Sequence, residues 1–486
     1  MQTTSYKGTD KVLIGFVLAV LTFWLFANSM MNVSPVMTEV LGMDANTMNI
    51  AVSIAALFSG IFIVVIGGLA DSIGRVKTFR IGLYLAILGS LLVGLSPKGD
   101  LAVPMLLIGR ALQGLSAAFV MPTSLGMIKI FWEGKERQRA ISLWSIGTFG
   151  GSGLSSLTGG LIASGLDSQW IAGWRWIFFF AIIVAVIALI LTKELPENKR
   201  EGAGKYKIDW GGIIMFMIAM IALQIFITNG NKFGWTSWIT IVLIAITLVF
   251  GYLFIYIEKK VPFAFVDFGL FKNKVFTGAS LANFFINGTS GMIIVSLTLM
   301  QRGAQFSTME AGLLTLGFAL AVILFIRVGE KLLQKFGAKK PIIWGALIIC
   351  VAILLLMQTQ IMTGQYVVLA VIAYSLFGLG LAFFATPATD AALSNLPDSQ
   401  AGSGAGIFKM ASSLGTSFGV AISAGIYTAV SSEEPIAWLS NTITFVGRSD
   451  NIAVRQGAML GLGFCLLLAV LVIITAVILI KDKKKE

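Results

Sequence analysis

The sequence predicts an all-α polytopic membrane protein, and three observations carry this prediction. Hydrophobic residues make up 57% of the 486-residue chain and charged residues only 12%, which is far more apolar than an ordinary soluble domain. Apolar runs of about 20 residues recur along the chain, and each is long enough to cross a bilayer as a helix. Short polar segments separate these runs. A bundle of membrane-spanning helices accounts for all three observations.

The apolar runs predict 14 transmembrane helices. The first run lacks a small-residue cleavage site behind a short apolar region, so we expect a retained helix and not a signal peptide. In chain order, the expected spans are residues 12–36, 48–69, 79–96, 101–127, 141–164, 174–192, 210–228, 238–257, 275–299, 309–328, 341–358, 366–386, 403–430 and 458–480.

Lysines and arginines gather in every second loop, which predicts that both termini are cytoplasmic. Residues 387–402 form the one inner loop that carries neither. The net charge of +12 therefore lies mostly in cytoplasmic loops and in the tail, where it would meet anionic lipid headgroups. We expect a multi-pass protein of a cell membrane, most simply a bacterial plasma membrane. We expect the positive charge to interact with membrane lipids, and binding to nucleic acid is not needed to explain it.

Cysteine and histidine usage excludes several chemistries. Cys350 and Cys465 both fall inside apolar runs, where they act as small packing residues, and the chain has no histidine. Without histidine or paired acids at depth, no nucleophile with a base and no metal site is visible. A membrane-embedded enzyme is therefore disfavoured, and we expect no cofactor and no metal. A channel is also disfavoured, because no ring of like charges or carbonyl-rich filter appears.

A short charged turn, GGLADSIGRVK at residues 67–77, separates the second and third spans. Gly67 and its glycine neighbour allow two helices to approach closely. Asp71 lies at the partly negative end of its helix, where a carboxylate needs a cation, and Arg75 follows four residues later. With Gly74 between them, these residues predict a charge cluster that latches one conformation and releases in another.

The chain also repeats itself. Residues 68–77 align with residues 331–340, which keep Gly74 as Gly337. The Ala-Asn-x-x-x-Asn pattern of Asn28 and Asn32 recurs at Asn283 and Asn287. Two parallel halves are typical of transporters in which one half rocks against the other. We therefore expect an N-terminal six-helix bundle at residues 1–200, two inserted helices at 201–262 and a C-terminal six-helix bundle at 263–486.

These motifs resemble the major facilitator superfamily, specifically its fourteen-helix drug:proton antiporter branch. Gly67 to Arg75 match the superfamily's Gly-x-Leu-Ala-Asp-x-x-Gly-Arg, and Arg110 to Gly114 match its Arg-x-x-Gln-Gly. The stretches around Asn49, Trp144 and Arg327 are most similar to exporters of the NorB type, which confer quinolone resistance. The resemblance implies the major facilitator fold and proton-coupled export.

Arg110 stands out on physical grounds. It lies nine residues into its helix, which places the guanidinium roughly 14 Å deep, near the middle of the bilayer. A charge at that depth normally faces the bundle interior and has a function. We expect Arg110, with Gln113, to act in coupling, as the resemblance implies. The alternative is a structural arginine held by backbone carbonyls and Gln113.

The chain departs from the relatives' pattern at three places. Asn28 stands close to where many relatives have an aspartate, Lys409 stands where they have an acid, and Ser155 and Ser156 replace the Gly-Pro of the fifth-helix motif. Further titrating candidates are Glu39 at the outer end of the first span, Asp390 at the inner end of the twelfth, and Asp71.

The expected pocket is apolar and aromatic. The chain has 35 phenylalanines, 11 tryptophans and 19 methionines, which offer an adaptable surface for varied flat or cationic molecules. Hydrogen bonding between helices explains the asparagines equally well. The pocket candidates are Trp24, Asn28, Asn32, Gln113, Trp144, Asn283 and Asn287.

We therefore expect a multidrug efflux transporter that exchanges protons for an amphipathic drug-like small molecule such as a quinolone, a biocide or a dye. The second hypothesis is an exporter of one endogenous lipid, siderophore or metabolite on the same scaffold. A proton-coupled importer is the third.

Overall fold

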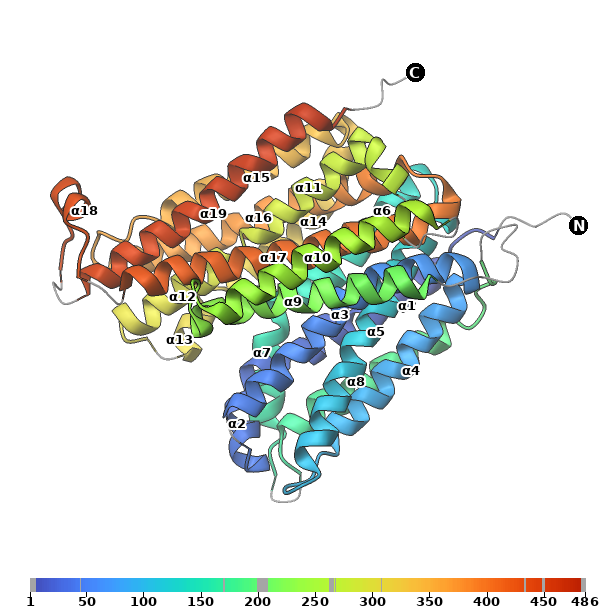
Figure 1. The fold of residues 1–486 in the computed structure, drawn as a ribbon, viewed down its shortest axis with the longest axis horizontal. Helices are drawn as coiled ribbons and strands as arrows, with labels where there is room; N and C mark the ends of the chain where they lie inside the picture. The colour runs from blue at the N-terminus through green and yellow to red at the C-terminus, as the bar shows by residue number, and fades with distance from the viewer. Residues whose placement is uncertain are drawn as a thin grey trace, which may run out of the picture. The chain divides into compact units, whose positions relative to one another are not determined.

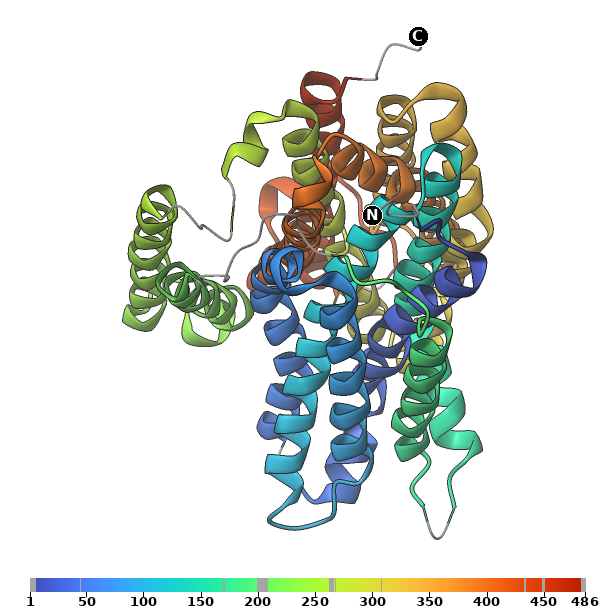
Figure 2. The same ribbon diagram turned by 90° about the vertical axis from the view of Figure 1, so that its right-hand side faces the viewer.

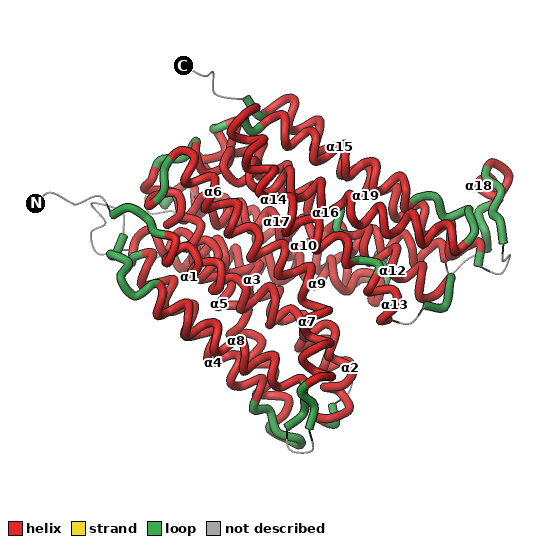
Figure 3. Tube along the Cα trace, turned by 180° about the vertical axis from the view of Figure 1, so that it is seen from behind, coloured by secondary structure: helices red, strands yellow, loops and turns green. Residues whose placement is uncertain are grey.

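The computed structural model describes residues 6–43, 45–168, 171–198, 209–261, 266, 268–306, 308–431, 434–447 and 451–481. Within these ranges every regular element is a helix (Figure 3). Twelve helices of the described part are long and apolar enough to span a membrane. The other two predicted spans, 141–164 and 210–228, are helical as well but do not fall among those twelve, so the structure supports the fold without reproducing the count of 14.

The helices of the first half and of the inserted segment are α1 (Asp10–Leu21), α2 (Met30–Leu41), α3 (Ala45–Ile73), α4 (Arg75–Gly94), α5 (Ala102–Phe131), α6 (Gly134–Ser145), α7 (Gly151–Gly165), α8 (Trp174–Leu191), α9 (Trp210–Phe233) and α10 (Trp238–Lys260). Shorter π and 3₁₀ segments interrupt the first and fifth spans: η1 (Thr22–Phe26), η2 (Ala27–Ser29) and η3 (Ile146–Gly150).

The second half contains η4 (Phe268–Lys272), α11 (Lys274–Gly288), α12 (Gly291–Gly303), α13 (Thr308–Leu313), α14 (Leu316–Phe336), α15 (Lys339–Leu356), α16 (Thr363–Ser394), η5 (Asp398–Gln400), α17 (Ala401–Ser431), α18 (Ala437–Thr442) and α19 (Ile452–Leu479) (Figure 1).

The chain divides into two compact units. Unit 1 comprises residues 1–221, 248–270 and 393–410, so it includes the first ten residues of α17, and unit 2 comprises the rest. In unit 1, α4 packs along α5 and α8, and α5 also packs on α3 (Figure 2). In unit 2, α19 packs along α11, α12 and α15.

Local sequence sets the helix ends. The Thr9 hydroxyl accepts a hydrogen bond from the Val12 amide and caps α1, and Asn273 caps α11 in the same way. The glycines that the repeat aligns, Gly74 and Gly337, both have positive φ, at +119° and +78°. Each follows a long helix, where only glycine reverses the backbone at low cost. The repeat therefore preserves a glycine with positive φ at the end of both helices.

Glycines also bring helices together in the same way in both units. A Cβ on Gly114 of α5 would clash with the carbonyl oxygen of Ala55 in α3, and a Cβ on Gly378 of α16 would clash with that of Phe318 in α14. The sequence repeat aligns Gly114 with Gly378. Small residues at these positions let the paired helices pack backbone to backbone.

Replacing Gly114 with valine is expected to destabilise the protein by about 1–3 kcal/mol, because the new side chain must displace the backbone of α3. Thermal unfolding of the purified protein measures the effect. Gly251→Val is the matched control, since nothing lies within 4 Å of a Cβ at that helical position. Equal unfolding temperatures for the two variants would contradict the close packing described above.

Candidate functional site

The Asp71 carboxylate is the centre of a buried polar cluster in unit 1. Its Oδ1 lies 2.7 Å from Nη2 of Arg75 and accepts a hydrogen bond from Nε of Arg75 at 2.8 Å. The same carboxylate accepts the amide of Gly402 at 2.9 Å and that of Ser403 at 2.9 Å, at the first turn of α17. The side chains of Asp71 and Arg75 are 5% and 2% exposed. A helix N-terminus and a guanidinium thus share one carboxylate.

Close backbone packing makes this geometry possible. A Cβ on Gly67 would lie 2.7 Å from the carbonyl oxygen of Gly402, and one on Gly406 would lie 2.9 Å from that of Ile63. Gly67 therefore allows α3 to cross the start of α17 at contact distance, which brings the Asp71 side chain onto the free amides.

Neighbouring loops complete the cluster. Nη2 of Arg75 donates to the carbonyl of Asp398 at 2.8 Å, and its Nη1 donates to the side chain of Asn198. Lys129, buried in α5, lies 2.8 Å from the Asp398 carboxylate and donates to the Leu396 carbonyl. Four helices of unit 1, α3, α4, α5 and α17, and the segments that carry Asn198 and Asp398 therefore meet in this cluster.

Residue Glu197 supplies the missing cap of α4. Because Gly74 has no side chain, the first turn of α4 has no capping group of its own. The Glu197 carboxylate accepts the amides of Val76 at 3.0 Å and Lys77 at 2.9 Å. The segment after α8 thereby fixes the turn that carries the charged motif.

Arg110 is 3% exposed and donates only to neutral oxygens. Its acceptors are the carbonyls of Ala51 at 3.0 Å, Ala27 at 2.8 Å and Val52 at 3.1 Å, together with Oε1 of Gln113 at 2.8 Å. Gln113 in turn donates to the Ser90 hydroxyl at 3.1 Å. Arg110 thus ties the first two spans to α5, and no described carboxylate forms an ion pair with it.

The asparagines of the repeat bind serines of the neighbouring helix. Nδ2 of Asn28 lies 3.3 Å from the Ser155 hydroxyl in unit 1, and Nδ2 of Asn283 lies 2.7 Å from the Ser412 hydroxyl in unit 2. Asn287 donates to the Asn283 carbonyl at 2.7 Å and to its side chain at 2.9 Å. Asn32 belongs to α2, but its side chain lies outside the described residues.

Two π-helical segments of unit 1, η1 and η3, precede Asn28 and Ser155 in the chain and pack on one another. Trp24 lies in η1, and its indole nitrogen is buried without a hydrogen-bond partner among the described residues. Trp144, in the last turn of α6, is fully buried and donates to the Ser124 hydroxyl at 3.0 Å. Widened turns of this kind occur frequently at functional sites.

The Lys409 ammonium lies over the ring of Trp144, 4.5 Å from its centroid. The rings of Phe149 and Phe408 lie 5.7 Å and 5.9 Å away. Lys409 is 7% exposed and forms no hydrogen bond or ion pair with a described residue.

Two acidic candidates remain. Glu39 is exposed near the end of α2 in unit 1, and Asp390 is 7% exposed near the end of α16 in unit 2.

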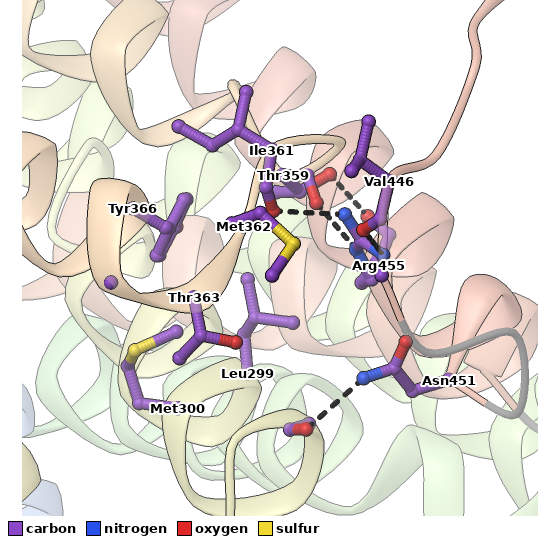
Figure 4. Close-up of a pocket in the computed structure, with 13 residues that line it drawn as sticks. Leu299, Met300, Thr359, Ile361, Met362, Thr363, Tyr366, Val446, Asn451 and Arg455 are labelled. Carbon is purple, nitrogen blue, oxygen red and sulfur yellow. Dashed lines mark hydrogen bonds between the residues drawn. The ribbon is translucent and has the colours of Figure 1, made fainter.

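A cavity of about 340 Å³ lies in unit 2 between the loop before α16 and the start of α19 (Figure 4). Arg455 borders it and donates to the carbonyls of Val446 at 2.9 Å, Ile361 at 3.0 Å and Thr359 at 2.5 Å. The guanidinium of Arg455 is thus bound to backbone carbonyls. Arg455 therefore joins two loops to α19, and its donors are not directed into the cavity for a ligand.

Comparison with known families decides what this helical fold is. The sequence profile of the Major Facilitator Superfamily matches residues 12–270, 208–420 and 279–485. The chain belongs to the major facilitator superfamily. This confirms the predicted fold and resemblance, and it makes the chain a multi-pass membrane transporter rather than an enzyme.

Among members of the superfamily, the chain is 47% identical over 428 residues to the quinolone resistance protein NorB of Staphylococcus aureus strain MRSA252, covering 88% of this chain and 90% of the relative. The NorB protein of strain MSSA476 matches with the same identity and coverage.

Solved structures of the superfamily show the same fold. The proton:xylose symporter XylE bound to 6-bromo-6-deoxy-D-glucose has a TM-score of 0.63 and 18% identity, over 95% of this chain and 94% of the other. The human organic anion transporter MFSD10 has a TM-score of 0.58 and 14% identity, over 95% and 98%.

Sequence reasoning missed the partners that lie far along the chain. Nothing local to Gly402, Ser403 or Glu197 marks them as ligands of the charged motif, because their role depends on backbone amides and on packing. The signal available for η3 is the glycine run Gly147, Gly150, Gly151 and Gly153, a pattern that favours close helix packing and does not by itself indicate a widened turn.

Proposed function

We propose that the chain exports amphipathic drugs, such as quinolones, biocides and dyes, in exchange for protons that enter down their gradient. The observation that carries this proposal is the 47% identity over 88% of the chain with a quinolone resistance protein. The absence of histidine and of a paired acid at depth in the sequence favours solute movement over chemistry on the solute.

The Asp71 cluster acts as the gate in this proposal. One carboxylate holds both Arg75 and the first turn of α17, so its bonds form or break together. A cluster of this kind gives a conformational change two discrete states. Gly67 and Gly74 serve the gate by allowing close packing and the reversed backbone at the end of α3.

Arg110 and Gln113 link the gate's helix to the first span, and we assign them the coupling role. The carbonyls that Arg110 binds come from α3 and from the junction of η1 and η2. A change in the hydrogen bonds of this guanidinium therefore affects the contacts of three spans at once. Asp390, which is buried, is the preferred proton carrier over the exposed Glu39.

The proposed drug contacts are the polar and aromatic candidates from the sequence. They are Trp24, Asn28, Asn32 and Trp144 in the first half of the chain, and Asn283 and Asn287 in the second half. The lysine and arginine distribution supports cytoplasmic termini, and the internal repeat supports two six-helix bundles at 1–200 and 263–486 with two inserted helices between them at 201–262.

Transport into inverted membrane vesicles tests the proposal. Vesicles that contain the protein and have an acidic lumen are expected to accumulate a quinolone and a cationic dye, because the proton gradient then drives solute inward. Accumulation should vanish when a protonophore collapses the gradient. Vesicles that accumulate neither solute under an acid-inside gradient would overturn the proposed function.

A further inference from the structure

The Lys409 ammonium differs from the other buried cations of the described chain. Arg75, Arg110, Lys129 and Arg455 each donate to a carbonyl or carboxylate oxygen. Lys409 is 7% exposed and has no such acceptor among the described residues, and three aromatic rings lie within 4.5–5.9 Å of its ammonium. Aromatic faces attract a cation but supply neither a full charge nor a lone pair. A buried ammonium held only by rings is thus incompletely compensated.

The surroundings of Lys409 come from parts of unit 1 that already show the features of a site. The indole N–H of Trp144 donates to the Ser124 hydroxyl, and this hydrogen bond fixes the position of the Trp144 ring. Phe149 lies within η3, one of the two widened turns. Lys409 itself lies roughly 12 Å along α17 from Ala401, well inside a membrane-spanning helix.

A second donor without an acceptor lies in the same region. The indole nitrogen of Trp24 is buried and has no partner in the described chain. Trp24 belongs to η1, which packs on η3, and a Cβ on Gly151 would lie 3.4 Å from its Cβ. Two buried hydrogen-bond donors, one of them cationic, favour a ligand that brings negative charge.

We propose that Lys409 binds the carboxylate of the transported molecule, so that the protein selects aromatic carboxylic acids over their uncharged esters and over monocationic dyes. The proposal rests on the proposed export function and names its substrate class. The flat apolar part of the ligand lies against the aromatic side chains while its carboxylate replaces the acceptor that Lys409 lacks. The ammonium already occupies the face of Trp144 that a cationic dye would otherwise use.

A matched pair of ligands tests this assignment. Binding of a quinolone carboxylic acid and of its methyl ester is measured by fluorescence on purified wild-type protein and on Lys409→Met, which keeps an unbranched side chain of similar length. Wild type is expected to prefer the acid by roughly tenfold, and Lys409→Met to lose that preference while its ester affinity stays within about twofold. Lys409→Arg should keep the preference, because it keeps the charge.

Two binding results would contradict the proposed role of Lys409. A wild type without preference for the acid, or a Lys409→Met variant that loses acid and ester binding in parallel, overturns the role of Lys409. Lys409→Gln repeats the comparison if the Met variant fails to fold. Drug transport by wild type in vesicles is scored separately: transport with no acid preference refutes this inference alone, whereas absence of any drug transport refutes the export function as well.

Discussion

Replacing Arg110 with alanine is expected to reduce proton-driven drug uptake into vesicles to the background of vesicles without the protein. The substitution removes four hydrogen bonds at once, including the one that orients Gln113. Each buried acceptor that loses its donor costs about 1–3 kcal/mol. Because the acceptors belong to three spans, the loss affects their mutual movement and not one local contact.

Two measurements separate coupling from a purely structural role for Arg110. Thermal unfolding reports stability, and drug–drug exchange without a pH gradient reports binding and movement. Loss of proton-driven uptake with retained exchange supports coupling, whereas loss of both together with a lower unfolding temperature supports a structural arginine. An Arg110→Ala variant with normal proton-driven uptake would show that neither assignment is correct.

Arg175→Ala is the matched control. This arginine, at the start of α8, also binds backbone carbonyls, those of Gly94 at 2.6 Å and Ser96 at 2.8 Å. It is only partly buried and joins a helix to a loop. Its replacement is expected to lower stability slightly and to leave proton-driven uptake nearly intact.

Replacing Asp71 with asparagine is expected to open the gate cluster and to abolish export. The amide group keeps one acceptor, but its NH₂ faces the donors of Arg75, Gly402 and Ser403, and the ion pair at 2.7 Å is lost. Hydrogen–deuterium exchange checks the structural part directly. The peptide that contains residues 402 and 403 should exchange roughly tenfold faster, because its amides lose a charged acceptor.

Asp10→Asn controls for the chemical change itself. Asp10 also forms two hydrogen bonds with an arginine, Arg139, at 2.7 Å and 2.9 Å, but its side chain is 62% exposed. Surface pairs contribute little, so uptake and exchange at residues 402 and 403 should match wild type. Unchanged exchange in Asp71→Asn would mean that the carboxylate does not hold α17.

The sequence allowed prediction of features that depend on short-range patterns. Apolar runs located the spans, and the presence of Arg75 four residues after Asp71 indicated that the two would form an ion pair. The glycine alignment anticipated a shared backbone turn at Gly74 and Gly337. Each of these follows from residues close together in the chain.

Features set by long-range packing escaped prediction. Gly402 and Ser403 lie more than 300 residues beyond Asp71, and each contributes a backbone amide, which every residue except proline carries. The Ser403 hydroxyl adds a hydrogen bond at 3.2 Å. The hydrogen bonds of Asn28 and Asn283 with serines likewise depend on which helix lies beside them. Periodicity in one helix contains no information about its neighbour.

The widened turns η1 and η3 have a consequence for how relatives are aligned. Each holds one residue more than an α-helical turn, and one residue corresponds to about 100° of rotation around the helix axis. The side of the fifth span on which Ser155 faces Asn28 is thus fixed by residue count within residues 146–150. In a homologue without that surplus residue, a gap-free alignment would equate positions that point in different directions, and would assign the wrong polar partner to the first helix.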